Sequence, residues 1–381
     1  MFDCRGQISS FLRKKHYFCH EKNQSDFFMN NFKYSFALLF YILCVVVTAC
    51  DSDTKYTPRH IGGVVWGTSY SITYDMSQCS DTIDIDHDIA EAINIVDVSA
   101  NTFDASSQIA QLNNCGVLEH PTPCLLSLLH LSEEINHLTG GAFDPTVAPL
   151  VNLWGFGPEK REVDPSQNEI DSALCLTGLQ NVEVTSDRVY FRHPGMLLDF
   201  SAIAKGLGVD YVAMAMDSCN IRNYIVEIGG ELRAHGHNPS GEPWTIQLDA
   251  PIPDRTGSHT RLALLRLNNA AVATSGNYRN FRFLSDGTPV YHTISPTTGR
   301  PVLSDVLSAT VISQSTAVAD ALATACMVLG LERATRLIEG LADNPLTAIY
   351  GAVFVTAGTT PDSFEIHPVI IDPTKFELST L

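Results

Sequence analysis

The sequence predicts an α+β fold, with mixed sheets and flanking helices. Strand-like and helix-like patterns are intermixed along the chain, without the regular strand–helix–strand repeat of a doubly wound fold. The chain has 381 residues, 45% of them hydrophobic, which is ample for a large core. We find no internal repeat and no Pro/Ser-rich interdomain linker, so we expect one large domain or two interlocked domains.

Hydrophobic periodicity and glycine positions predict the elements of the first half of the globular part. They indicate, in order, a strand over residues 64–74, a helix over 84–99, a helix over 123–138 ending at Gly140-Gly141, a Gly-, Pro- and Trp-bearing loop over 142–158, a helix over 166–176 and a hairpin over 182–191. In the segment 101–113, Asp104 or Ser106 could cap the helix that follows.

The same criteria predict the second half. They indicate a strand end entering a helix over residues 199–216, a strand over 224–228 closed by Gly229-Gly230, several strands between 244 and 283, a small-residue-rich helix over 315–329, and a helix over 331–341.

The first 49 residues are predicted to be a signal peptide and not part of the globule. Residues 36–49 form an apolar run behind Lys33, which is short for a membrane span and typical of a signal-peptide core. We expect translation to start at Met29, since this leaves a signal of ordinary length. The run ends at Ala49-Cys50, in a stretch that resembles the bacterial lipobox, whose cysteine is acylated and becomes the first mature residue.

We therefore expect a lipid anchor at Cys50, a polar tether over residues 50–60 and a globular domain over residues 61–381. Several acyl chains on one cysteine anchor a protein stably, whereas one chain binds only marginally. Asp51 resembles an inner-membrane retention signal. The expected location is the periplasmic face of the bacterial inner membrane.

The net charge of −18 argues against nucleic acid or anionic lipid headgroups as partners of the folded surface. Any phosphate site must then be made locally, by a metal or by backbone amides. The cysteines show no CxxC spacing, so we assign them neither a metal nor a redox role.

Four segments combine glycine, small polar residues and carboxylates where a plain core would have Leu and Val, at residues 101–113, 140–158, 199–208 and 315–324. Asp199 precedes a helix start that carries Ala202 and Lys205. The unpaired N–H groups of a helix start suit phosphate, although many helices begin this way. The loop at residues 140–158 could receive a planar ring, or it could be a packed Ω-loop.

Asp320 and Thr324 are four residues apart and share one face of the expected helix. Their hard oxygens suit Mg²⁺, but an Asp near a helix start is also common as a solvated residue. His292 precedes a turn-rich stretch and could be a general base near neutral pH, or it could be structural.

The joint order of these segments resembles the ApbE family of FAD:protein FMN transferases. The motifs that carry the resemblance extend from about Gly67 to Gly330 and are GTSYSI, TFDASS, GGAFDPTV, DFSAIAKG, IVEIGGELRAHG, TSGNYRNF, HTISPTTGRPV and ADALATA. The resemblance implies an α+β fold with FAD in a cleft between two lobes and Mg²⁺ beside its diphosphate.

Carried over by motif position, the resemblance implies Mg²⁺ ligands at Asp320, Thr324 and the backbone carbonyl of Ala202. The implied flavin contacts are Trp66, Phe103, Ala142, Phe143, Asp144, Asp199, Lys205 and Ile294. Relatives often have Met in place of Trp66, Tyr in place of Phe103, and an acid in place of Lys205.

The implied reaction is attack of a Thr or Ser hydroxyl on the FMN phosphorus of FAD, with release of AMP. His292 is the expected proton acceptor, and Asp199 would orient it or share that task. The resemblance implies an acceptor flavoprotein with a periplasmic domain, such as a subunit of a quinone reductase or of an Rnf complex. Two alternatives stay open: Mg²⁺-dependent hydrolysis of FAD to FMN and AMP, and a non-catalytic FAD-binding lipoprotein.

Overall fold

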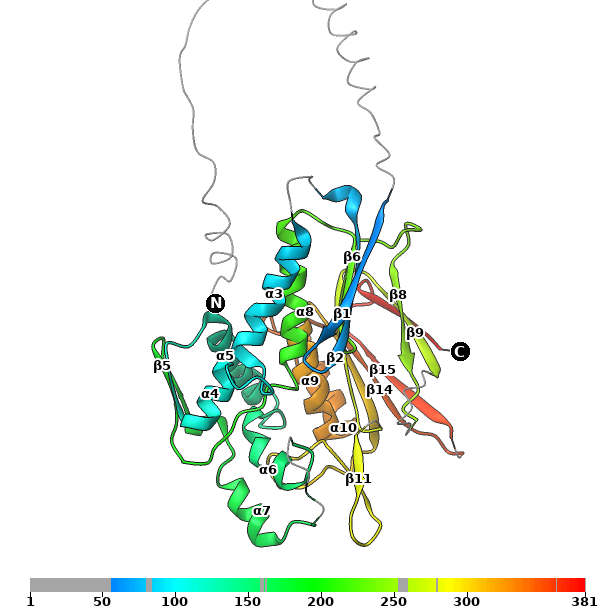
Figure 1. Ribbon diagram of the computed structural model, residues 1–381. Coiled ribbons are helices and arrows are strands. Elements are labelled where there is room, and N and C mark those ends of the chain that lie inside the picture. Colours follow the sequence, from blue (N-terminus) through cyan, green and yellow to red (C-terminus); the bar gives the residue numbers. More distant parts are fainter. Residues whose placement is uncertain are drawn as a thin grey trace, which may run out of the picture. The chain divides into compact units, whose positions relative to one another are not determined.

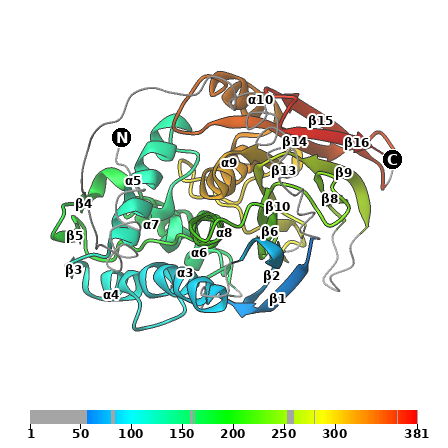
Figure 2. The same cartoon turned by 90° about the horizontal axis from the view of Figure 1, so that it is seen from above.

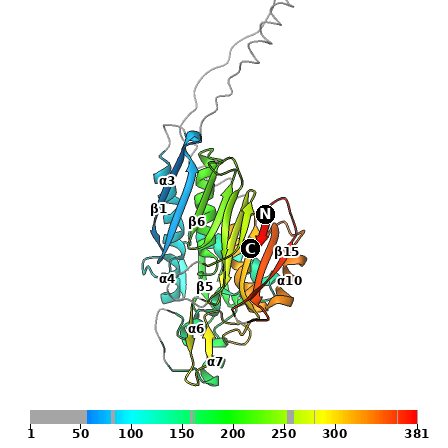
Figure 3. The same ribbon diagram turned by 90° about the vertical axis from the view of Figure 1, so that its right-hand side faces the viewer.

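An eight-stranded antiparallel sheet forms the centre of the fold (Figure 1). The computed structural model describes residues 56–79, 84–157, 161, 163–252, 260–278, 280–360 and 362–380. In spatial order, the strands of the sheet are β1 (Pro58–Val65), β2 (Thr68–Asp75), β6 (Tyr224–Ile228), β7 (Glu231–His235), β10 (Ala270–Gly276), β13 (Val306–Ser313), β14 (Ile349–Ala357) and β15 (Phe364–Ile370). Figure 3 shows the sheet running from β1 at one edge to β15 at the other.

The central strand β13 shows how both faces of this sheet are covered. Val311 belongs to a hydrophobic cluster under the helices, whereas the next residue, Ile312, belongs to a cluster shared with a second sheet. Successive strand side chains point to opposite faces, so a strand covered on both sides is apolar throughout. Figure 2 shows α9 on one side of the large sheet and β8 and β9 on the other.

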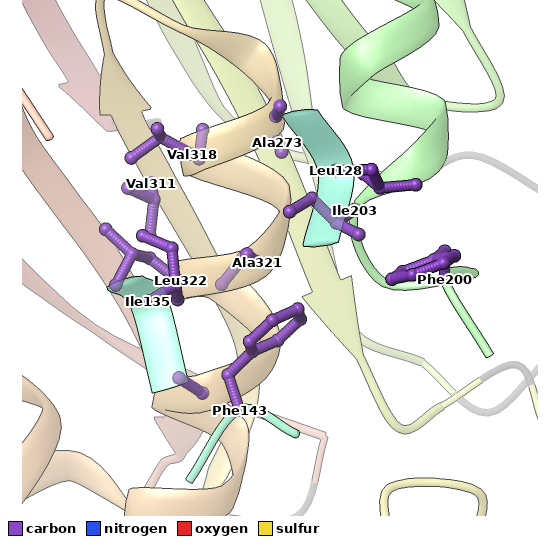
Figure 4. Close-up of a cluster of buried hydrophobic side chains, with 14 of the residues drawn as sticks. Leu128, Ile135, Phe143, Phe200, Ile203, Ala273, Val311, Val318, Ala321 and Leu322 are labelled. Carbon is purple, nitrogen blue, oxygen red and sulfur yellow. The ribbon is translucent and has the colours of Figure 1, made fainter. Parts of the chain in front are cut away.

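The helices gather mainly on one face of the large sheet. In chain order they are α3 (Ile85–Ala100), α4 (Gln108–Cys115), α5 (Pro123–Leu138), α6 (Ala148–Leu153), α7 (Gln167–Leu174), α8 (Ala204–Ser218), α9 (Thr316–Leu329) and α10 (Leu331–Gly340). In the core, Leu128 and Ile135 of α5 lie near Ala321 and Leu322 of α9 (Figure 4). The α9 helix is therefore enclosed by the sheet on one side and by other helices on the other.

Local sequence signals explain where several helices begin. Thr122 caps α5 by accepting a hydrogen bond from the Leu125 N–H, and Pro123 occupies the first helical position. Ser166 and Glu169 form a capping box at the start of α7. The helices expected at residues 84–99, 123–138, 166–176, 315–329 and 331–341 are confirmed, as are the strand at 224–228 and the hairpin at 182–191.

Several sequence predictions need correction. The segment at residues 142–158 is not a loop throughout, because it contains the helix α6. Residues 64–74 are not one strand, because Trp66 and Gly67 adopt positive φ angles of 48° and 75° and turn the chain between β1 and β2. The cap of α4 is Ser107, whose side chain accepts from the Ala110 N–H, and not Asp104 or Ser106. No strand ends at Asp199, which lies in an irregular segment before α8.

Short sheets complete the fold. One has the order β3 (Val117–Glu119), β5 (Arg188–Phe191), β4 (Val182–Val184), another the order β16 (Phe376–Thr380), β9 (Arg261–Leu267), β8 (Trp244–Asp249), and the third pairs β11 (Phe281–Phe283) with β12 (Pro289–Tyr291). The sequence analysis placed strands between residues 244 and 283, but it assigned none of β12 to β16.

Residues 55–381 form one compact unit. The predicted start at Met29 and the predicted lipidation at Cys50 lie outside the described residues. Pro58–His60 belong to β1, so the last part of the expected tether at 50–60 is in fact strand. Within the described ranges, no helix combines the length and the apolar character needed to cross a bilayer.

Candidate active site

A cavity of about 880 Å³ collects the segments that the sequence analysis singled out. Its wall is formed by residues near Phe103, by the loop at residues 142–148, by residues 197–205 at the start of α8, by Gly229 and Glu231, by the end of β10, by residues 292–296, and by one face of α9. The predicted site residues that line it are Phe103, Ala142, Phe143, Asp144, Asp199, Ala202, Lys205, His292, Ile294, Asp320 and Thr324.

The oxygen pair on α9 faces this cavity as the helical spacing predicts. Asp320 is only 2% exposed, and its Oδ2 accepts a hydrogen bond of 3.1 Å from the backbone N–H of Gly206. Thr324 lies one turn further on, with its Oγ1 at 3.0 Å from Ser275 Oγ on β10. The pair thus brings a carboxylate and a hydroxyl to the same stretch of wall.

Gly206 allows α8 and α9 to approach closely enough to build this wall. A Cβ at Gly206 would lie 2.4 Å from the carbonyl oxygen of Thr316, which is backbone and cannot move aside. The glycine is therefore required by the close approach of two helices. Its backbone N–H is the one that bonds to Asp320.

These oxygens fit a divalent cation. Burial raises the pKa of Asp320, and the Lys205 ammonium opposes the shift, so a further positive charge beside this carboxylate would stabilise its ionised form. Asp320, Thr324 and the carbonyl of Ala202 would supply hard oxygen ligands, and Mg²⁺ usually completes its shell with water and substrate phosphates. Among the described residues, no group of three or more His, Cys, Asp or Glu side chains could hold a metal by itself.

Lys205 is paired with Glu231, a residue that the sequence analysis did not single out. Lys205 Nζ lies 2.6 Å from Glu231 Oε1 and 3.8 Å from Asp320 Oδ1. Burial acts to lower the pKa of Lys205, but the two carboxylates outweigh it and raise this pKa, so the ammonium stays charged. Burial raises the pKa of Glu231, and Lys205 opposes that shift. Glu231 lies in the motif IVEIGGELRAHG, where an acidic residue follows an apolar strand and two glycines. This was the feature of the sequence that could have indicated a site residue.

His292 lines the cavity, in surroundings that favour a neutral imidazole. Burial lowers its pKa from the usual value, and the nearby positive charge of Lys205 lowers it further. Its Nδ1 is buried without a hydrogen-bond partner among the described residues, and its ring meets the edge of Phe156. A neutral imidazole with a free nitrogen can accept a proton.

Asp144 and Asp199 help to shape the loops that form the wall. Asp144 Oδ1 accepts hydrogen bonds from the N–H and the hydroxyl of Thr146, at 2.9 and 2.5 Å, and burial raises the pKa of this carboxyl. Asp199 Oδ1 accepts from the Ser201 N–H at 2.8 Å, while the Asp199 N–H donates to the Pro145 carbonyl. The loop after α5 and the segment before α8 are thereby joined.

Trp66 is the predicted flavin contact within the described residues that does not line the cavity. Its Nε1 donates a 2.8 Å hydrogen bond to Asp97 Oδ1 on α3, and its ring lies against Gly208 of α8. Phe103, by contrast, is 78% exposed and lines the cavity. The two aromatic residues therefore have different surroundings, one packed between helices and one at the rim.

The cavity combines a pair of helix-borne oxygens, a half-buried lysine and a histidine with a lowered pKa, which suits group transfer on a phosphate-bearing ligand. Residues 66–349 match the model of the ApbE family. The chain is 38% identical over 299 residues to an FAD:protein FMN transferase of Vibrio cholerae, covering 77% of this chain and 88% of that one. It is 34% identical over 308 residues to the one of Haemophilus influenzae, covering 78% and 87%. This chain belongs to the ApbE family.

Solved structures agree with this assignment. The flavin transferase ApbE from Vibrio cholerae superposes with a TM-score of 0.71 at 33% identity, covering 84% of this chain and 99% of that one. The apo form of Pseudomonas stutzeri flavinyl transferase ApbE gives a TM-score of 0.71 at 31% identity, covering 82% and 95%. The expected α+β fold is therefore confirmed.

Proposed function

We propose that this chain transfers FMN from FAD to a Thr or Ser hydroxyl of an acceptor protein and releases AMP. Relatives at 33 to 38% identity over most of the chain are FAD:protein FMN transferases. The observation that carries the proposal is the convergence of distant motifs on one cavity, whose wall holds Asp320, Thr324, Lys205 and His292 together. The reaction makes this chain a transferase.

Asp320, Thr324 and the carbonyl of Ala202 would hold Mg²⁺ beside the diphosphate of FAD. When bound, Mg²⁺ neutralises the negative charge that develops on phosphoryl oxygens. The Lys205 ammonium adds a second positive charge at the same wall. The acidic chain can bind an anionic cofactor because these charges are local.

His292 is the proposed general base. The hydroxyl oxygen of the acceptor forms a bond to the FMN phosphorus, the bond from that phosphorus to the bridging oxygen breaks, and AMP departs with the bridging oxygen. The hydroxyl proton passes to the imidazole of His292, which lines the cavity and whose lowered pKa favours the neutral form near pH 7. Asp199, on the same wall, would orient the hydroxyl or share the proton.

Apolar and small residues of the wall would receive the flavin. Phe103 at the rim, Ala142 and Phe143 in the loop after α5, and Ile294 after β12 all line the cavity. Planar rings bind well against aromatic and aliphatic side chains with close backbone approach. Trp66 would act indirectly, by packing under α8.

The signal-peptide pattern before Cys50 supports a lipid anchor and a location on the periplasmic face of the bacterial inner membrane. The acceptor would then be a membrane-bound flavoprotein with a periplasmic domain, such as a quinone reductase or Rnf-type subunit. The acidic composition disfavours nucleic acid as a partner.

The test is mass spectrometry of a candidate acceptor, the periplasmic domain of a quinone reductase subunit, after incubation with this chain, FAD and Mg²⁺. The expected result is an FMN adduct on one Thr or Ser, together with AMP. A parallel reaction without acceptor measures hydrolysis. FMN and AMP formed at the same rate with and without acceptor, and no adduct, would identify a pyrophosphatase and overturn the proposal.

A further inference from the structure

Lys205 lies between two buried carboxylates at unequal distances. Its Nζ is 2.6 Å from Glu231 Oε1 but 3.8 Å from Asp320 Oδ1. The first distance is that of a charge-assisted hydrogen bond, and the second is not. The ammonium is therefore bonded to Glu231, although a short movement would bring it onto Asp320.

The fold holds Glu231 firmly in this place. It is the first residue of β7, directly after a turn in which Gly229 and Gly230 adopt positive φ angles of 61° and 99°. Its side chain is 5% exposed, and its Oε2 is buried without a hydrogen-bond partner in the described part of the chain. A buried carboxylate with one strongly bonded oxygen and one unpartnered oxygen in a cavity wall calls for a role beyond packing.

Asp320 is bonded on one side only. Its Oδ2 accepts the Gly206 N–H, whereas Oδ1 is the oxygen nearest to Lys205. If the ammonium moved into contact with Oδ1, it would compete with a divalent cation for this oxygen, because both are attracted by the same charge. In the structure the ammonium is bonded to Glu231 instead, at the wall of the cavity.

We propose that Glu231 is a positioning residue that holds the Lys205 ammonium off Asp320. The inference rests on the proposed function for the identity of the ligand, an anionic diphosphate. Glu231 leaves Asp320 free for the cation and leaves Lys205 facing the phosphate oxygens. Glu231 therefore affects cation binding at Asp320 only through its bond to Lys205.

Binding of Mn²⁺ to the full chain without flavin, followed by the electron paramagnetic resonance signal of the free ion, tests this role. In Glu231→Gln, Lys205 is free to close on Asp320, so Mn²⁺ affinity falls on the order of tenfold. In Lys205→Met the competitor is gone, and Mn²⁺ affinity equals or exceeds that of the native chain. The double variant behaves like Lys205→Met, because Glu231 acts through Lys205.

A matched control has the same change of charge outside the cavity. Glu242 Oε2 pairs with Arg266 Nη2 at 2.8 Å on the surface, so Glu242→Gln leaves Mn²⁺ affinity unchanged. Thermal melting verifies that each variant folds. If Glu231→Gln is unfolded, Glu231→Asp replaces it in the test. This variant keeps the charge but has a shorter reach, so it shows a smaller loss of Mn²⁺ affinity.

FAD binding without divalent cations, measured by flavin fluorescence, is the second readout. Lys205→Met weakens it, because the ammonium no longer meets the diphosphate. The positioning role would be overturned if Glu231→Gln lowered Mn²⁺ affinity equally in the native chain and in Lys205→Met. It would also be overturned if Glu231→Gln lowered the affinity in neither. If the loss of Mn²⁺ affinity on Glu231→Gln depends on Lys205 but no FMN is transferred to the acceptor, only the proposed function is refuted. If FMN is transferred but the loss does not depend on Lys205, only the positioning role is refuted.

Discussion

The carboxylate of Asp210 on α8 accepts a hydrogen bond of 3.0 Å from the backbone N–H of Ala317, in the first turn of α9. It also accepts hydrogen bonds from the Thr316 N–H at 2.9 Å and the Ser315 hydroxyl at 2.7 Å. The first turn of a helix leaves N–H groups unpaired, and here a neighbouring helix supplies their acceptor. Asp210 thereby fixes the helix that carries Asp320 and Thr324.

Asp210→Ala should therefore destabilise the protein. The change removes these bonds and the partner of Arg233, whose Nη1 lies 3.4 Å from Asp210 Oδ1, so we expect a loss of about 2 to 4 kcal/mol of unfolding free energy. Urea unfolding followed by circular dichroism measures it. Asp171→Ala on exposed α7 is the control, with an expected change within about 0.5 kcal/mol. Equal effects of the two variants would contradict the role of Asp210.

Gly206→Ala should separate α8 from α9. The added methyl group would lie 2.4 Å from the Thr316 carbonyl oxygen, so we expect a loss of about 1 to 3 kcal/mol or more of stability, and weaker metal binding at Asp320. Gly340→Ala, at the end of α10, meets no atom within 4 Å and should be close to neutral. Differential scanning calorimetry of both variants provides the comparison. A Gly206→Ala protein as stable as the native one would show that the helices can shift at little cost.

His292→Ala should slow FMN transfer far more than it weakens FAD binding. The loss expected for a general base is about 100- to 10,000-fold in kcat. His292→Gln, which keeps a polar side chain but cannot accept the proton in the same way, should be similarly slow. Rapid-mix transfer assays and flavin fluorescence separate the two effects. Unchanged turnover in both variants would remove His292 from the mechanism.

The pH dependence follows from the lowered pKa of His292. Burial keeps the imidazole neutral to below its ordinary pKa of about 6.5, so the acid limb of kcat/KM should lie below pH 6.5. The same shift affects stability with a definite sign. The unfolded chain binds the proton at a higher pH than the folded chain, so unfolding free energy falls as pH drops from 6.5 through the folded pKa and then levels off.

Stability measured against pH checks this sign. Native protein should lose unfolding free energy relative to His292→Gln between pH 7 and pH 5, because only the native chain carries the penalised imidazole. A difference that stays constant over this range would mean that folding does not lower the pKa of His292.

Asp320→Asn and Thr324→Val should each weaken divalent-cation binding, because each removes an oxygen that the cation uses. We expect Asp320→Asn to be more severe, since it also removes a charge. Ser275→Ala is an informative neighbour, because Ser275 Oγ touches Thr324 Oγ1 at 3.0 Å, and its loss should have a smaller effect. Titration of transfer activity with Mg²⁺ measures all three. Native Mg²⁺ dependence in Asp320→Asn would place the cation elsewhere.

Elements whose signals are local could be predicted from the sequence. The helix at Pro123–Leu138 begins at a proline and is followed by Gly140-Gly141, and these local signals predicted its approximate bounds. The spacing of Asp320 and Thr324 likewise needs only helix geometry. The motifs that carry the family resemblance also led to the residues that line one cavity.

Long-range contacts account for what was missed. The strands β13 and β14 lie side by side in the sheet, but nothing within either segment specifies its partner. The position of Trp66 depends on a hydrogen bond to Asp97 and on the absence of a side chain at Gly208, and neither could be predicted locally. Glu231 was overlooked because its meaning comes from Lys205, which lies on another element.

The α9 helix is buried along nearly its whole length, with residues such as Ala319, Ala321 and Ala323 fully inaccessible to solvent. Backbone amides in such a place exchange with solvent only when the whole domain opens. The oxygens of Asp320 and Thr324 are thus held by a helix whose amides we expect to be among the last to exchange. Any motion that admits and releases ligand must then arise at the rim, around the loop that carries Phe103, and not at the centre where the chemistry takes place.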